Sequence, residues 1–95
     1  MSTTPPRVVM YATDWCPYCS RARRLLDSKQ VAYQEIDIEM SPEARAEMQQ
    51  RSGRTSVPQI FVGDVHVGGC DDLHALEARG GLDALLAGGA PAKNS

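Results

Sequence analysis

Two cysteines separated by two residues, Cys16 and Cys19, stand directly after an apolar stretch and directly before a helical pattern. Pro17 between them is favoured at the first position of a helix, where its missing N–H costs nothing. The pattern therefore predicts Cys16 at a helix start, where free backbone N–H groups and the helix dipole favour negative charge. A thiol in such a place loses its proton more readily than a free thiol. We expect an exposed, reactive sulfur at Cys16 and a more buried, less acidic one at Cys19.

The stretch around this pair has the order strand, helix, strand. Residues 7–12 are apolar and partly β-branched, which is typical of a strand buried on both faces. Residues 17–29 carry Ala22 and Leu26 on one stripe at helical spacing, and residues 31–38 alternate as a second strand does. Such a unit of about thirty residues predicts two parallel strands joined by a right-handed crossover.

The second half of the chain predicts a helix, a hairpin and further helical turns. A hydroxyl, a proline and a carboxylate at residues 41–43 are typical of a helix start, and this helix should end near Gly53. Residues 57–62 and 65–67 are apolar runs joined by Gly-Asp, which indicates an antiparallel hairpin. Leucines at helical spacing in residues 71–86 predict one helix and a short last one. The expected fold class is α/β, with a small four-stranded mixed sheet and helices on both faces.

The 95 residues are enough for one small domain. We assign residues 7–87 to it and expect residues 1–6 and 88–95 to be disordered tails. A net charge of −2 argues against binding to nucleic acid, which needs a basic face. No stretch reaches the roughly 18 apolar residues of a membrane span, and the first residues lack the apolar core of a signal peptide. An odd number of cysteines, three, is not typical of a secreted disulfide framework, so we expect a cytoplasmic protein.

Three segments of the chain carry the chemistry: the Cys16–Cys19 pair, Val57-Pro58 at the entrance of a strand, and a second helix start at residues 68–72. In this order and spacing they resemble dithiol glutaredoxins with the motif Cys-Pro-Tyr-Cys, and the bacterial glutaredoxin 3 type in particular. The resemblance covers residues 8–86 and implies a thioredoxin-like fold. It also implies a cis Val57–Pro58 bond, although only about one X-Pro bond in twenty is cis in folded proteins.

The resemblance implies a glutathione-dependent thiol–disulfide oxidoreductase that reduces protein disulfides and glutathione mixed disulfides. Cys16 would be the nucleophile and Cys19 the resolving thiol, and together they would form the redox-active disulfide. The implied co-substrate is glutathione, without a metal. The implied partners are glutathionylated or disulfide-bonded proteins, ribonucleotide reductase among them. We expect a cytoplasmic monomer that binds neither nucleic acid nor membranes.

Eight further residues are implied to hold glutathione: Tyr18, Arg54, Ser56, Val57, Pro58, Cys70, Asp71 and Asp72. Tyr18 would flank the tripeptide, and Val57 would pair with its cysteinyl part through backbone groups, as extended peptides do on an exposed edge. Arg54 would bind the glycyl carboxylate by a charge-assisted contact. Residues 70–72 would hold the γ-glutamyl end, because its ammonium suits a carboxylate and its carboxylate suits the N–H groups of a helix start.

One position departs from the family pattern. Many glutaredoxins have a lysine three residues before the first cysteine, where this chain has Thr13. Without that ammonium we expect the Cys16 thiolate to be less stabilised or glutathione to bind more weakly. Trp15, immediately before Cys16, is similar to the tryptophan that precedes the motif in thioredoxins.

Other features have a structural interpretation. Cys70 is expected to be a small buried residue rather than a reactive one. His66 and His74 are interpreted as strand-surface and helix-surface residues, and the arginines at 21–24 as a solvated helix face that could steer acidic partners.

Alternatives from other classes remain open. Cys16 and Cys19 could be half of a zinc site completed by Cys70 and a histidine, although the gap between Cys19 and Cys70 is longer than small zinc modules use. A redoxin recharged directly by thioredoxin reductase would be active without glutathione. A dimer bridging an iron–sulfur cluster through Cys16 and glutathione is the third alternative, and Pro17 with Cys19 argues against it.

Overall fold

The computed structural model describes residues 7–88. Its elements are β1 (Val8–Ala12), α1 (Pro17–Ser28), β2 (Tyr33–Asp37), α2 (Pro42–Ser52), β3 (Gln59–Val62), β4 (Val65–Gly68), α3 (Cys70–Ala78) and α4 (Gly81–Leu86). Every predicted helix and strand is present, close to its expected boundaries. The expected tail at residues 1–6, and all of the expected C-terminal tail except Gly88, lie outside the described residues. Within the described range, no helix combines the length and the apolar character that crossing a membrane would require.

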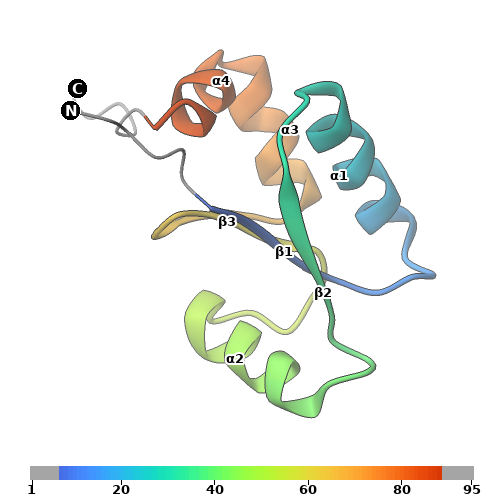
Figure 1. The fold of residues 1–95 in the computed structure, drawn as a ribbon. Coiled ribbons are helices and arrows are strands. Elements are labelled where there is room, and N and C mark those ends of the chain that lie inside the picture. Colours follow the sequence, from blue (N-terminus) through green and yellow to red (C-terminus); the bar gives the residue numbers. More distant parts are fainter. Residues whose placement is uncertain (1–6, 89–95) are drawn as a thin grey trace.

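The four strands form one mixed sheet in the order β2–β1–β3–β4 (Figure 1). β1 is parallel to β2 and antiparallel to β3, and β3 is antiparallel to β4. All five residues of β1 are buried, which confirms the prediction of a strand covered on both faces. The predicted strand–helix–strand unit and hairpin are both confirmed.

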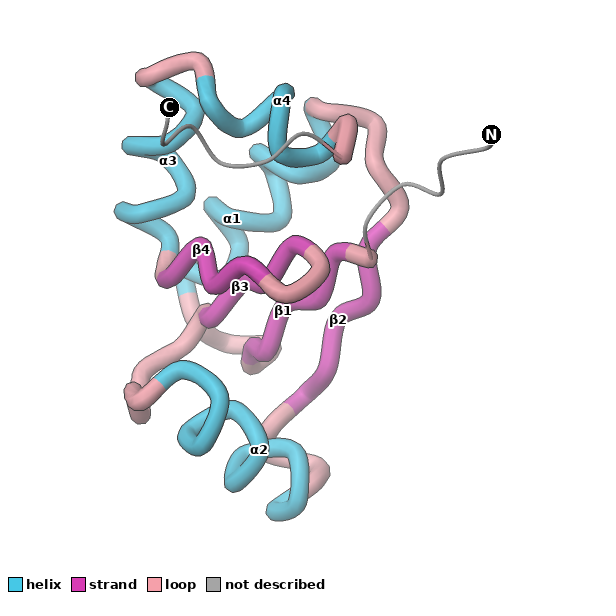
Figure 2. The backbone as a smooth tube through the Cα atoms, turned by 90° about the vertical axis from the view of Figure 1, so that its left-hand side faces the viewer, coloured by secondary structure: helices cyan, strands magenta, loops and turns pink. Residues whose placement is uncertain are grey.

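Helices cover both faces of this sheet, as predicted: α1, α3 and α4 lie on one side and α2 on the other (Figures 1 and 2). Side chains alternate along β1, so that Met10 packs in the larger core cluster with α1, α3 and α4. Its neighbour Tyr11 packs in the smaller cluster with α2. The sheet is therefore the middle layer of three, and both cysteines of the motif belong to the larger cluster.

The strand directions bring distant parts of the sequence to one edge of the sheet. Because β3 is antiparallel to β1, the end of β1 lies beside the start of β3, with Tyr11 opposite Gln59. Because β4 is antiparallel to β3, its end lies there too, with Gly68 opposite Ile60. The segments that follow β1, precede β3 and follow β4 are therefore neighbours, and these are the three segments that carry the motifs.

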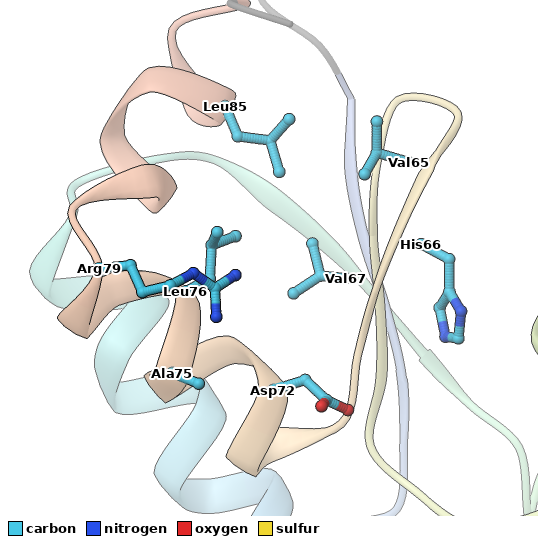
Figure 3. A pocket seen from close by; sticks show the side chains of 8 residues that line it. All are labelled: Val65, His66, Val67, Asp72, Ala75, Leu76, Arg79 and Leu85. Carbon is cyan, nitrogen blue, oxygen red and sulfur yellow. The ribbon is translucent and has the colours of Figure 1, made fainter. Parts of the chain in front are cut away.

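A cavity of about 250 Å³ lies between β4 and the helices α3 and α4 (Figure 3). Val67 and Leu76 are among the apolar side chains that line it. Of the predicted site residues, only Asp72 lines this cavity. His66, although it belongs to the same strand as Val67, directs its ring away from the cavity. The cavity therefore lies next to the predicted site and shares Asp72 with it.

Candidate active site

Cys16 lies at the start of a helix, as the sequence predicts. It is the N-cap residue of α1, with extended backbone angles (φ −81°, ψ 121°), and Pro17 follows at the first helical position. The Cys16 carbonyl accepts the first helical hydrogen bond, from Ser20 N at 3.1 Å. The Cys16 Sγ lies 4.0 Å from the Val57 carbonyl oxygen. The sulfur therefore sits where α1 meets the segment that enters β3.

The two cysteines differ less in exposure than predicted. Cys19 is fully buried, but Cys16 also has only 6% of its surface exposed, so the expectation of an exposed Cys16 is wrong. The reason is that Cys16 packs in the core cluster beneath α1, while its aromatic neighbours Trp15 (69% exposed) and Tyr18 (54%) project outward. Trp15 Nε1 donates a hydrogen bond to Glu39 Oε2 at 2.6 Å.

The environment of Cys19 keeps its thiol protonated. Burial raises the pKa of Cys19 to about 11; a hydrogen bond with the Thr13 backbone opposes this increase, and the Cys16 sulfur adds to it. At neutral pH a thiolate at Cys19 is therefore rare. Cys19 is the more buried of the two, as predicted, and its thiol is less acidic than an ordinary cysteine because its pKa is raised.

A pocket of about 250 Å³, which we call the groove below, is lined by Val57 but not by Cys16 itself. Cys16 is next to it through the contact of its Sγ with the Val57 carbonyl oxygen. The groove is lined by residues of α1, of the α2–β3 loop and of the α3 start: Tyr18, Arg54, Ser56, Val57, Pro58, Gly69, Cys70, Asp71 and Asp72. The fold thus brings together all eight residues that the resemblance assigns to glutathione, with Gly69 in addition. The Val57–Pro58 bond is cis, as the resemblance implied.

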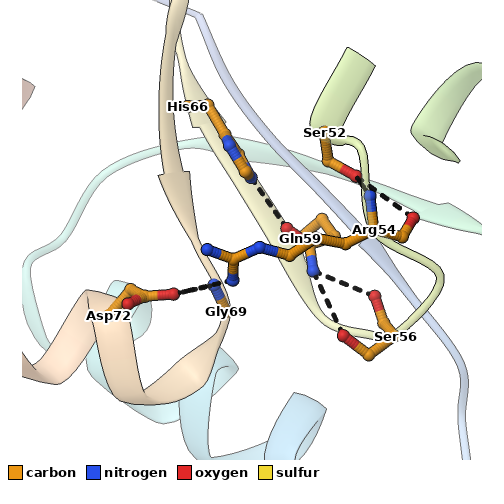
Figure 4. A network of polar contacts seen from close by, with 7 residues as sticks. All are labelled: Ser52, Arg54, Ser56, Gln59, His66, Gly69 and Asp72. Atoms are coloured by element: carbon orange, nitrogen blue, oxygen red, sulfur yellow. Dashed lines mark hydrogen bonds and ion pairs between the residues drawn. The ribbon is translucent and has the colours of Figure 1, made fainter. Parts of the chain in front are cut away.

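Asp72 connects two walls of the groove. Its Oδ2 accepts hydrogen bonds from Gly69 N and from Arg54 Nη1, each at 3.0 Å (Figure 4). The Gly69 N–H and then the Arg54 guanidinium lower the pKa of this carboxyl group. Gly68 allows the arrangement because its φ is 115° and a Cβ there would clash with the Asp72 carboxylate. Arg54 and Asp72 thus meet across the groove, although the resemblance assigns them to opposite ends of the tripeptide.

Comparison with known proteins shows to which protein family a chain with this site belongs. A protein-family model described as Glutaredoxin matches residues 8–67, which is more than half of the chain. The chain belongs to the glutaredoxin family.

Individual glutaredoxins agree over most of the chain. Glutaredoxin from Pseudomonas aeruginosa is 60% identical over 81 residues, which cover 85% of this chain and 96% of the relative. Glutaredoxin 3 from Escherichia coli K12 is 58% identical over 79 residues, which cover 83% and 95%. The solved buckwheat glutaredoxin–glutathione complex is 31% identical, with a TM-score of 0.79 over 85% of this chain and 76% of that one.

The predicted fold and enzyme class are therefore confirmed. This glutaredoxin has a thioredoxin-like fold and is a glutathione-dependent thiol–disulfide oxidoreductase, with Cys16 and Cys19 as its Cys-x-x-Cys motif.

Sequence analysis missed a hydrogen-bonded chain behind the groove of this glutaredoxin. Gln59 is fully buried, and its Nε2 donates to the Ser56 carbonyl oxygen at 3.1 Å. Gln59 Oε1 lies 2.8 Å from His66 Nε2 (Figure 4), and the His66 ring stacks on Phe61 with centroids 4.8 Å apart. His66 is partly exposed on the edge strand β4, in agreement with its interpretation as a strand-surface residue, but its bond to Gln59 was not expected. A glutamine inside an apolar strand was the available signal, because a buried amide needs partners.

The prediction that Arg23 belongs to a solvated face of α1 is wrong. It donates to the Thr13 carbonyl oxygen at 3.1 Å and to Glu35 Oε1 at 2.8 Å, and so ties α1 to β2. The Glu35 carboxylate raises the pKa of Arg23, and the Arg23 charge opposes the increase at Cys19. Arg21 and Arg24, in contrast, are exposed as expected.

The zinc alternative lacks a set of ligands. Across residues 7–88, no three His, Cys, Asp or Glu side chains converge where a metal ion could bind. Cys70 Sγ contacts His74 Nδ1 at 3.5 Å, one turn along α3, and burial raises the pKa of the Cys70 thiol. Both observations agree with a structural interpretation of Cys70.

Proposed function

We propose that Cys16 is the nucleophile of this glutaredoxin and Cys19 its resolving thiol. The observation that carries the proposal is the position of the Cys16 Sγ, 4.0 Å from the Val57 carbonyl oxygen beside the groove. Cys19 is fully buried and has a pKa of about 11, so it is a poor attacking group in the reduced protein. The two sulfurs are therefore suited to act in a fixed order.

In this proposal the groove holds glutathione. Val57 offers a backbone N–H and C=O to the cysteinyl part, and the N–H groups at the start of α3 suit the γ-glutamyl carboxylate. Asp72 suits the γ-glutamyl ammonium and Arg54 the glycyl carboxylate. Because Arg54 and Asp72 are paired at 3.0 Å, the bound tripeptide must replace or share their ion pair. The glutathione complex of the similar buckwheat glutaredoxin supports this role of the groove.

The chemistry is thiol–disulfide exchange. The Cys16 thiolate attacks the glutathione sulfur of a glutathionylated protein and forms a new S–S bond. The old S–S bond breaks, its electron pair leaves with the protein sulfur, and that sulfur takes up a proton. A second glutathione thiolate then attacks the mixed disulfide, which releases oxidised glutathione and the Cys16 thiolate. With a protein disulfide, the Cys16 thiolate first attacks one sulfur, and the other sulfur leaves and takes up a proton. Cys19 then gives up its proton and attacks Cys16, so that the mixed disulfide breaks, the reduced protein leaves and the Cys16–Cys19 disulfide forms. Two glutathione molecules reduce this disulfide and leave as oxidised glutathione.

Turnover by two serine variants tests this order of events. We expect Cys16→Ser to lose the reduction of both a glutathionylated peptide and a protein disulfide. Cys19→Ser should still reduce the glutathionylated peptide, because a second glutathione can replace Cys19, but it should lose the dithiol route. Retained activity in Cys16→Ser would refute the assignment.

We further propose that the protein works as a cytoplasmic monomer on glutathionylated or disulfide-bonded proteins. Three free thiols in 95 residues support a reducing compartment. Turnover with thioredoxin reductase and NADPH but without glutathione should be absent, and protein purified without oxygen should be colourless and monomeric. Activity without glutathione would support the thioredoxin-reductase alternative, and a coloured dimer would support the cluster-binding one.

A further inference from the structure

His66 lies outside the groove but is connected to it through Gln59 (Figure 4). The Ser56 carbonyl oxygen can only accept a hydrogen bond, so the amide nitrogen of Gln59 must face it. The amide oxygen of Gln59 therefore faces His66, and His66 Nε2 must carry a proton and donate it. The two hydrogen bonds therefore run in one direction: His66 donates to Gln59, and Gln59 donates to Ser56.

The charge state of His66 agrees with this direction. Burial lowers the pKa of His66, and the guanidinium groups of Arg54 and Arg51 lower it further, while Asp72 opposes them. The ring is therefore neutral at neutral pH and has a single N–H. Because Gln59 needs that N–H on Nε2, the contact selects one tautomer of the ring.

The last acceptor of these hydrogen bonds is the carbonyl group of the peptide unit that joins Ser56 to Val57. In a trans peptide the C=O and the N–H lie in one plane and point in opposite directions. A hydrogen bond that holds the Ser56 carbonyl behind the groove therefore also fixes the direction of the Val57 N–H. At the other end of the same loop, Ser52 Oγ accepts from Arg54 N at 3.0 Å. The loop that lines the groove is thus held by side chains at both ends.

We propose that His66 is a positioning residue for glutathione, acting through Gln59 to orient the Ser56–Val57 peptide toward the groove. His66 is not among the residues that line the groove, so it acts without touching the ligand. The inference rests on the proposed pairing of glutathione with the Val57 backbone.

Replacing His66 by phenylalanine tests the inference. His66→Phe keeps an aromatic ring to stack on Phe61 but removes the N–H. Loss of one such hydrogen bond is expected to raise KM for a glutathionylated peptide about three- to tenfold, with kcat unchanged. The conservative variant His66→Gln places an amide N–H near the former Nε2 and should restore KM to within about twofold of wild type.

Tyr11→Phe is the matched control. It removes the bond from Arg51 Nη1 to Tyr11 Oη (3.0 Å) on the same face of the sheet, but this bond has no link to Ser56. It should lower the midpoint of thermal unfolding and leave KM unchanged. If His66→Phe does not fold, the double variant His66→Phe, Gln59→Met removes both partners of the His66–Gln59 hydrogen bond and still frees the Ser56 carbonyl. The same rise in KM is then expected.

The outcomes separate this inference from the proposed function. An unchanged KM in folded His66→Phe, or an equal rise in Tyr11→Phe, would overturn the role of His66. A fall in kcat alone would overturn it as well. Failure of wild type to turn over with glutathione, or an undisturbed Val57 amide resonance when glutathione is added, would instead refute the proposed function itself.

Discussion

Cys16 and Cys19 are three residues apart, yet they differ in what surrounds their sulfur atoms. Both belong to the larger core cluster, but the Cys16 Sγ lies 4.0 Å from the Val57 carbonyl oxygen at the groove, whereas Cys19 is fully buried. The enclosure matters chemically, because a thiolate loses its hydration when it is buried. Burial therefore supports the proposed order, in which Cys19 reacts after Cys16.

Titration of a Cys16→Ser variant checks the burial of the other thiols. Burial raises the pKa of Cys19 and also that of Cys70 above the ordinary 9.0 of a cysteine. The midpoint of the thiolate absorbance should therefore lie above pH 9.0 for both thiols in the folded variant. The same variant in denaturant should titrate near the ordinary value. A thiolate step below 9.0 in the folded state would contradict the assigned environment.

Thr13 is a second residue whose surroundings can be tested. It is 2% exposed, and among residues 7–88 its Oγ1 has no hydrogen-bond partner. A buried hydroxyl without a partner costs about 1–3 kcal/mol, so Thr13→Val is expected to stabilise the fold by about 1 kcal/mol. In a domain of this size, that gain raises the midpoint of thermal unfolding by about 4–8 °C. Thr13→Ser keeps the hydroxyl and should show no gain; equal melting of Thr13→Val and wild type would refute the argument.

The burial of Thr13 also affects how one can test the effect of having threonine where many glutaredoxins have lysine. That the Cys16 thiolate is less stabilised without this lysine stays a prediction. A Thr13→Lys variant would put an ammonium group into a buried position, and its destabilisation would mix with any effect on the sulfur.

Among the secondary-structure elements, α3 begins with a carboxylate whose contacts depend on its charge. The Gly69 N–H and Arg54 stabilise the Asp72 carboxylate and lower its pKa below the ordinary 3.8. The unfolded chain lacks these contacts, so they stabilise the folded state above pH 3.8. This stabilisation disappears as the pH falls through the lower pKa of the folded state.

Thermal unfolding of Asp72→Asn tests this pH dependence. At neutral pH the variant should melt at a lower temperature than wild type, because asparagine can still accept from Gly69 but cannot pair with Arg54 as an anion. The difference should shrink as the pH falls below 3.8. A difference that is independent of pH would show that the carboxylate charge plays no part.

The elements themselves were predictable because their signals are local. Pro17 and Pro42 mark the starts of α1 and α2, and the N-cap hydroxyl of Ser41 accepts from Ala44 N as expected. The turn after α1, which has no glycine, is completed by Gln30 in the left-handed region with φ 59°. A local pattern does not reveal which residue will take up such a conformation, so the path of this turn could not be predicted.

For the molecule as a whole, the sequence predicted which segments form the groove but not how they contact one another. The eight groove residues came from the family resemblance, and the strand order explains why they meet. Contacts between segments distant in sequence, such as Arg54 with Asp72 and His66 with Gln59, depend on strand register and loop path. The burial of Cys16 depends on packing between layers in the same way. None of these leaves a periodic pattern in the sequence.

Trp15 is the chain's single tryptophan, and it lies on the exposed surface immediately before Cys16. All indole fluorescence of the protein therefore comes from one ring, next to Cys16 in the chain and bonded to Glu39. Its emission reports on a single place in the molecule, without an attached dye. Recording that emission while a glutathionylated peptide is added shows whether the reaction at Cys16 reaches the neighbouring indole.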